Sequence, residues 1–128
     1  MIPPRPPLHP AVVAAQQAYH ADLVNEVAAA VAAHEVVVVG VSGLAPGRRA
    51  RAYLDAASIP YKYLQYGSYF SGWRRRLALK MWVGWSTFPL VFVRGTFIGG
   101  ASDLKRLLDS GELAALRALP VGAAAARG

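Results

Sequence analysis

The sequence predicts a single α/β domain in which one mixed sheet carries helices on both faces. A chain of 128 residues fits one domain, since domains usually run to roughly 100–200 residues. The run EVVVVGV at 35–41 is short, continuously apolar and β-branched, which is typical of a strand covered on both faces. A strand–helix–strand order precedes a hairpin, and this order favours one mixed sheet.

The first third of the chain is expected to form an arm and a helix before the sheet begins. Residues 1–10 are rich in proline, which predicts an irregular arm. Apolar residues then recur at spacings of three, four and seven, which predicts one extra N-terminal helix over 11–34. The elements expected next are a strand over 35–41, a turn over 42–47 and a helix over 48–57.

The second half of the chain alternates strands and helices up to a flexible tail at 120–128. The segment YKYLQY alternates and is rich in aromatic residues, so it is expected to be a strand. The full order expected is a strand over 61–66, a helix over 73–83, hairpin strands over 90–94 and 96–98, a helix from Ser102 or Asp103 to Leu108, and a helix over 112–119. The folded domain therefore spans 35–119.

The sequence contains no cysteine. This excludes from the chain a disulfide, a cysteine-held zinc or iron–sulfur cluster, and a thiol nucleophile. The three histidines lack metal-ligand spacing. Ser42 has no plausible His–Asp partnership, and Gly43 and Gly47 lack the Lys-[Ser/Thr] of a phosphate loop.

No apolar run reaches the roughly 18–20 residues that a membrane span needs. The N-terminus also lacks the continuous apolar region of a signal peptide. We therefore expect a soluble, cytoplasmic protein.

The net charge of +7 belongs to one third of the sequence. Between residues 42 and 80, eight Lys or Arg residues are opposed only by Asp55, and the rest of the chain is balanced. Such asymmetry indicates an anionic ligand or partner, with a solvated face as the plainer alternative. Aromatic residues interleave with these cations, but a packed strand and helix edge is favoured over nucleic-acid binding.

Five segments between residues 35 and 113 match one family pattern in order: EVVVVGV, RRARAYL, IPYKYLQY, WSTFPLVFVRGTFIGG and DSGEL. They resemble the glutaredoxin family, which has the thioredoxin-like fold. Trp85, two residues before Thr87, is similar to the form found in monothiol glutaredoxins. The resemblance implies a glutaredoxin-type domain with a four-stranded sheet.

The active-site motif of that family does not carry over. Glutaredoxins place Cys-Pro-Tyr-Cys or Cys-Gly-Phe-Ser between the first strand and the first helix, and the matching positions here are Leu44, Ala45, Pro46 and Gly47. The family's lysine aligns with Val41. Thiol–disulfide exchange needs a thiolate, so we expect a chain that cannot catalyse it alone. No iron–sulfur cluster is expected.

Part of a glutathione site is retained by resemblance. In the family, the residue before a cis-proline bonds the cysteine moiety of glutathione through its backbone, and that residue is Phe88 here. Arg76 aligns with the arginine that holds the glycine carboxylate, for which a guanidinium fork is suited. Ser102 replaces a carboxylate that pairs with the ligand ammonium, and Asp103 is the candidate to compensate. The implied site comprises Arg76, Thr87, Phe88, Pro89, Gly100, Ala101, Ser102 and Asp103.

Two functional hypotheses follow from these residues. The first is a redox-inactive glutathione-binding module, acting as a sensor or carrier. The second is a protein-interaction or assembly domain that no longer binds glutathione, with the apolar Leu44 as the contact and Trp82 as a further candidate if exposed. The plainer interpretation of Thr87 to Pro89 and of Gly99-Gly100 is a pair of structural turns.

Overall fold

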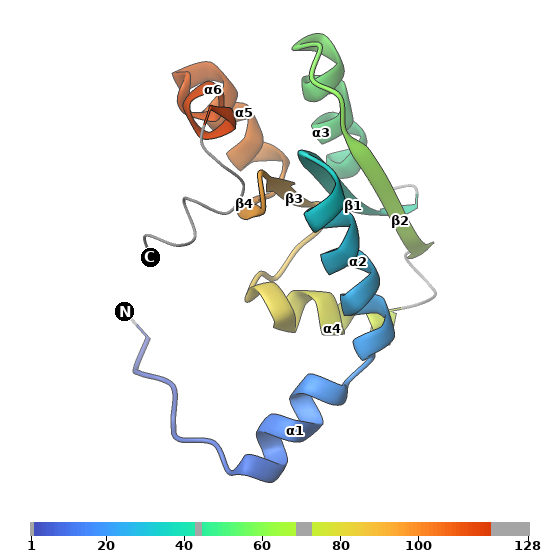
Figure 1. Cartoon of the computed structure of the whole chain (residues 1–128), viewed down its shortest axis with the longest axis vertical. Coiled ribbons are helices and arrows are strands. Elements are labelled where there is room, and N and C mark those ends of the chain that lie inside the picture. Colours follow the sequence, from blue (N-terminus) through green and yellow to red (C-terminus); the bar gives the residue numbers. More distant parts are fainter. Residues whose placement is uncertain (1, 43–44, 69–72, 119–128) are drawn as a thin grey trace.

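The computed structural model describes residues 2–42, 45–68 and 73–118. Within them the chain forms six helices and four strands (Figure 1). In order these are α1 (Pro10–Ala18), α2 (Ala21–Ala33), β1 (Val36–Ser42), α3 (Ala45–Ala56), β2 (Lys62–Ser68), α4 (Trp73–Val83), β3 (Leu90–Val93), β4 (Thr96–Gly99), α5 (Ala101–Ser110) and α6 (Glu112–Arg117).

The four strands form one mixed sheet in the order β2-β1-β3-β4. β1 is parallel to β2 and antiparallel to β3, and β3 is antiparallel to β4. The register pairs Val39 with Leu90 and Ser42 with Ser68. The predicted fold class, a thioredoxin-like α/β domain with a mixed four-stranded sheet, is confirmed.

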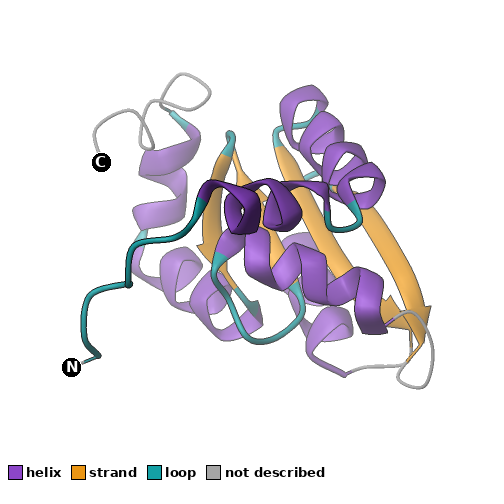
Figure 2. Ribbon diagram, turned by 90° about the horizontal axis from the view of Figure 1, so that it is seen from below, coloured by secondary structure: helices purple, strands orange, loops and turns teal. Residues whose placement is uncertain are grey.

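The sheet has a hydrophobic cluster on each face, because successive side chains of a strand point to opposite sides. Val36 and Val38 of β1 pack with α3, α5 and α6, whereas Val37 and Val39 pack with α2 and α4. Figure 2 shows these helices on both sides of the strands. All four valines are at most 1% exposed, and each such burial contributes about 1.5–3 kcal/mol. The continuous apolar run of β1 is therefore explained by cover on both faces.

The single N-terminal helix expected over 11–34 is wrong, because the structure has two helices there. Tyr19 ends α1 in an extended conformation, and His20 then adopts a left-handed conformation with φ 44°. Asp22 lies in the first turn of α2, where a carboxylate favours a helix start. Apolar spacing is similar on both sides of the junction, so periodicity alone could not locate the break.

The helix predicted over 73–83 has the same bounds as α4, and the other element boundaries differ from the predictions by a few residues. α3 begins at Ala45 rather than at residue 48, so Pro46 and Gly47 belong to its first turn. Proline is tolerated there, since the first N–H groups of a helix have no internal partner. α5 begins at Ala101 with Gly100 as its N-cap, one or two residues before the predicted cap. The predicted tail over 120–128 lies outside the described residues.

No helix in the described part of the chain is both long enough and apolar enough to cross a bilayer.

Candidate functional site

Three helices begin at one end of the sheet. The registers place the last residues of β1 and β2 beside the start of β3, and Val91 of β3 pairs with Gly99 at the end of β4. Because α3, α4 and α5 follow β1, β2 and β4 in the chain, their N-termini share that end with the turn before β3. We call it the convergent end of the sheet. Helix N-termini carry partial positive charge, which favours an anion.

The turn before β3 contains a cis peptide bond between Phe88 and Pro89. Thr87 is exposed, Phe88 is half-buried and Pro89 is buried. The Lys80 Nζ atom lies 5.6 Å from the centroid of the Phe88 ring, which keeps one cation of the basic segment beside this turn. The cis bond assigned by resemblance is therefore present.

Gly100 lies next to the cis-proline turn. A Cβ atom built on Gly100 would be 3.5 Å from the carbonyl oxygen of Pro89 and 3.9 Å from Nε1 of Trp85. The Trp85 ring in turn packs edge-on against Phe97, with centroids 5.5 Å apart. From the sequence, Trp85 stands out only because it is similar to the form found in monothiol glutaredoxins. The structure places its indole N–H beside the start of α5.

Asp103 closes the first turn of α5. Its Oδ2 atom accepts a hydrogen bond of 2.9 Å from the Gly100 N–H, the arrangement in which an N3 carboxylate reaches back to the N-cap. Its Oδ1 atom lies 3.3 Å from Nη2 of Arg106. The carboxylate proposed to meet a ligand ammonium thus already satisfies two groups of its own helix, while Ser102 is exposed beside it.

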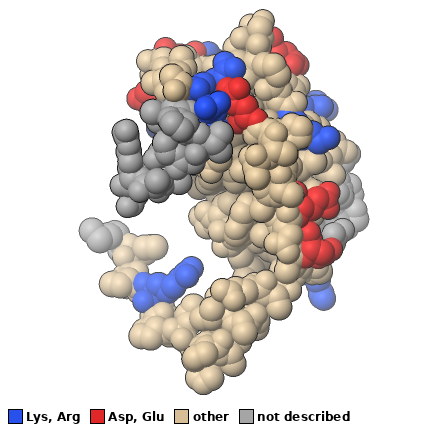
Figure 3. Space-filling model, viewed as in Figure 1, with Lys and Arg blue, Asp and Glu red and all other residues tan. Residues whose placement is uncertain are grey.

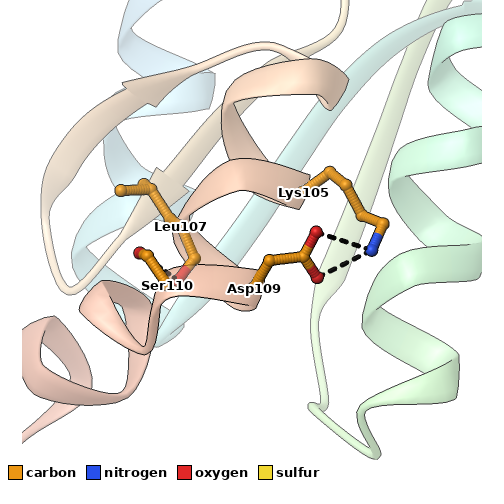
Figure 4. Close-up of polar contacts among 4 residues, drawn as sticks. All are labelled: Lys105, Leu107, Asp109 and Ser110. Atoms are coloured by element: carbon orange, nitrogen blue, oxygen red, sulfur yellow. Dashed lines mark hydrogen bonds and ion pairs between the residues drawn. The ribbon is translucent and has the colours of Figure 1, made fainter.

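The outer face of α5 is held by its own ion pair. Lys105 Nζ lies 2.7 Å and 2.8 Å from the two carboxylate oxygens of Asp109 (Figure 4). Ser110 Oγ donates to the Leu107 carbonyl at 3.3 Å, also drawn in Figure 4. Both contacts are exposed and lie in the later turns of the helix, so they fix α5 without occupying its N-terminus.

Arg76 lies near the start of α4 and is only 7% exposed. Its Nη1 atom donates to the carbonyl of Tyr66 on β2 at 3.3 Å. The Tyr66 hydroxyl in turn donates to Oε1 of Glu26 on α2 at 2.9 Å. The guanidinium is therefore built into the packing between α4 and β2, at the convergent end of the sheet.

The other cations of the basic segment do not all gather at the convergent end. Arg48 and Arg49 are exposed in α3, and Arg51 stacks on the Tyr63 ring with its Cζ atom 4.2 Å from the centroid. Lys62 opens β2 and pairs with Val37, which places it toward the other end of the sheet. The charge asymmetry of the sequence is therefore partly dispersed by the fold.

Tyr63 fills space below the first turn of α3. A Cβ atom built on Gly40 would be 2.7 Å from the Tyr63 hydroxyl oxygen, and one built on Gly47 would be 3.9 Å from it. The hydroxyl donates to Oε1 of Gln65 at 3.3 Å. Alternation in YKYLQY puts Tyr63 on the α3 face, but only the structure shows that Gly40 makes room for its ring.

The fold raises the pKa of Tyr61. Burial raises the pKa of the Tyr61 phenol, and the hydrogen bond to Asp55 and that carboxylate's negative charge raise it further. Tyr61 packs against the cluster under α3, so this pair helps to close that side of the core and lies apart from the cis-proline turn in the chain.

The predicted site residues fall into two groups in space. Pro89, Gly100 and Asp103 come together with Trp85, whereas Arg76 is anchored on β2 at the same end of the sheet. Ala45 to Gly47, predicted as a degenerate active-site turn, form the first turn of α3. Leu44 lies outside the described residues.

Comparison with known proteins places this arrangement in a family. No family model matches the chain. A glutaredoxin-like protein of Dictyostelium discoideum is 43% identical over 95 residues, which are 74% of this chain and 77% of that protein.

Solved structures agree on the fold. The crystal structure of a mutated buckwheat glutaredoxin superposes with a TM-score of 0.69 at 21% identity, covering 77% of this chain and 90% of that one. A buckwheat glutaredoxin–glutathione complex superposes with a TM-score of 0.65 at 20% identity, covering 77% and 89%. At these identities the likeness establishes the fold alone.

Proposed function

Because the chain belongs to the glutaredoxin family, we propose that it is a cysteine-less glutaredoxin-like protein that binds glutathione without thiol–disulfide exchange. The observation that carries the proposal is the convergence of the cis-proline turn, the α5 N-terminus and Arg76 at one end of the sheet. The 128 residues contain no cysteine to act on a bound ligand.

Binding would use mainly backbone groups. The backbone at Phe88 would bond the cysteine moiety of the tripeptide, as the family resemblance implies. The N–H groups of Ala101 and Ser102, at the start of α5, would receive the γ-glutamyl carboxylate, since a helix N-terminus favours an anion. Arg76 would attract the glycine carboxylate from its anchored position on Tyr66.

The chemistry stops at binding because no group of the chain can form a mixed disulfide. Attack on a disulfide sulfur requires a thiolate on the attacking protein, and the chain has none. The proposal therefore assigns a sensing or carrier role, in which the two forms of glutathione are ligands and neither is a substrate. A buckwheat glutaredoxin of the same fold has been solved as a complex with glutathione, which supports glutathione as the ligand.

The proposal is tested by titrating isotope-labelled protein with reduced and with oxidised glutathione and recording the amide NMR signals at each step. We expect saturable shifts at residues 88 and 100–103. S-methylglutathione, which has no thiol, should bind as well as the reduced form because the site offers no sulfur chemistry. Absence of shifts at millimolar ligand would overturn the proposal.

A pair of variants locates the site. Arg76→Gln should weaken binding, while Arg94→Gln should not, because Arg94 follows β3 at the opposite end of the sheet. Circular dichroism must show that both variants are folded, since Arg76 also bonds Tyr66. Equal affinity of the two variants for glutathione would show that Arg76 is not part of the binding site.

A further inference from the structure

A proline-rich arm over residues 2–9 plays no part in the proposed glutathione site. Residues 2–9 belong to no helix or strand and lead directly into α1. In Figures 1 and 2 the arm runs outside the helices and the sheet. All the prolines that precede α1 are exposed: Pro3, Pro4, Pro6 and Pro7. The arm therefore offers apolar side chains that the domain does not bury.

The covalent chemistry of the arm favours the polyproline II conformation. Five of residues 2–10 are proline, and three of the other four directly precede a proline, so only Leu8 is neither. Proline fixes φ at about −65°, and the residue before it is pushed to extended or polyproline II angles. His9, which precedes Pro10, has φ −63° and ψ 143°, close to the polyproline II values of about −75° and 145°. The arm is thus restricted to an extended, left-handed helix.

A polyproline II helix of this sequence separates its prolines from its other side chains. The helix has three residues per turn, so every third side chain lies on the same ridge. The three ridges carry Pro3 and Pro6, Pro4 and Pro7, and lastly Ile2, Arg5 and Leu8. The two Pro-Pro pairs therefore lie one turn, or about 9 Å, apart along the helix.

The ridge without prolines is the one turned toward the domain. Leu8 is half-buried, whereas the other residues of the arm are exposed. Arg5 lines a groove of about 480 Å³ with residues of α1, α2 and α4, among them Trp82, which is 43% exposed. Arg5 is also the only Lys, Arg, Asp or Glu in residues 2–21, and Figure 3 shows the arm and α1 as a largely uncharged end of the molecule. The two proline ridges consequently face away from the domain.

We propose that the arm binds a partner protein, in an aromatic-lined groove of the kind by which SH3 and WW domains take polyproline helices. Such grooves recognise two prolines one turn apart, and the arm and the start of α1 offer this spacing as Pro3 with Pro6, Pro4 with Pro7, and Pro7 with Pro10. Because the arm is restricted before it binds, ordering it costs little entropy. A nucleic acid or an anionic membrane selects several Lys or Arg residues, and the arm has one. The contact uses no residue of the proposed glutathione site, so the two proposals stand or fall separately.

Isothermal titration calorimetry of the full chain against a panel of purified SH3 and WW domains tests the proposal. We expect at least one domain to bind saturably. Replacing Pro4 and Pro7 together by alanine should weaken that binding by about tenfold or more, because one proline ridge is lost. Replacing Ile2 and Leu8 together by alanine is the matched control, since it trims two apolar side chains of the ridge turned toward the domain. This control should change the affinity by no more than about twofold.

Amide NMR of the labelled chain locates the contact with the domain that binds. Shifts at residues 5, 8 and 9 support the arm, and shifts confined to other residues contradict it. Failure of every domain in the panel to bind the wild-type chain at several hundred micromolar would overturn the proposal. So would equal affinity of the two double variants, because the prolines would then not be the contact. All four substituted residues lie outside the helices and strands, so the fold should tolerate both variants, which circular dichroism checks.

Discussion

The backbone N–H of Gly100 donates a 2.9 Å hydrogen bond to the carboxylate of Asp103. This bond joins the end of β4 to the first turn of α5, and it fixes the loop beside the cis-proline turn. It leaves Asp103 committed to the protein's own backbone. A ligand ammonium would therefore have to share a carboxylate that also faces Arg106.

Removing the Asp103 carboxylate should destabilise the fold. We expect Asp103→Ala to lower the free energy of unfolding by about 0.5–2 kcal/mol, the usual cost of losing a helix N-terminal cap. Asp109→Ala is the control, because its exposed ion pair with Lys105 is of a kind worth about 0.3–0.5 kcal/mol. Urea denaturation measures both. An Asp103→Ala variant no less stable than Asp109→Ala would show that the capping bond is not formed in solution.

Gly40 should tolerate no side chain while Tyr63 is present. The Cβ of Gly40→Ala would lie 2.7 Å from the Tyr63 hydroxyl oxygen and 3.1 Å from a ring carbon, and Arg51 stacks on that ring. We expect a loss of about 1–3 kcal/mol, as for other overpacked cores.

A double-mutant cycle separates the clash from other effects of the alanine. In a Tyr63→Ala background, Gly40→Ala should cost much less, because the obstructing ring is gone. Equal costs in the two backgrounds, measured by urea denaturation, would show that the ring does not occupy the space above Gly40.

Tyr61 should ionise at a higher pH in the folded chain than in the unfolded chain, because burial and Asp55 raise its pKa. A raised pKa stabilises the fold below the unfolded value of about 10. That stabilisation is lost as the pH rises through the folded value. Ultraviolet absorbance of the phenolate in wild-type and Tyr61→Phe chains reports the titration. The difference between the two titrations gives the pKa of Tyr61 in the folded chain. A pKa at or below the unfolded value would contradict the prediction.

We expect no catalysis of disulfide reduction by glutathione. The chain lacks the thiolate that exchange requires, so the rate with the chain present should equal the uncatalysed rate. A coupled assay of glutathione oxidation measures this, with a cysteine-containing glutaredoxin as the positive control. Turnover that rises in proportion to chain concentration would contradict the prediction.

The sheet was predictable because its residues are specific to strands. The run of valines in β1 and the alternating aromatic residues of β2 are typical of strands. The proline before β3 marks the start of that strand. The break at Tyr19 and His20 was not predictable, since alanine and valine occur at similar spacing in α1 and α2. The left-handed conformation of a single residue, His20, does not change the spacing of apolar residues in the sequence.

The candidate site was predictable mainly as a set of turns. Pro89 and Gly100 are brought together by the pairing of β3 with β4, which a family pattern encodes. The partners of the charged groups were not predictable. Arg76 is bonded to a β2 carbonyl and Asp103 to its own helix N-terminus, and these contacts depend on distances that spacing does not give.

The position of Trp85 gives the chain an internal optical probe. Its indole nitrogen lies beside Gly100 and its ring meets Phe97, whereas the Trp82 ring lies against Phe92. Fluorescence from Trp85 should therefore respond to a ligand at the α5 N-terminus. The sequence has two other tryptophans, Trp73 and Trp82, so the difference between the emission of the wild-type chain and that of Trp85→Phe isolates this signal.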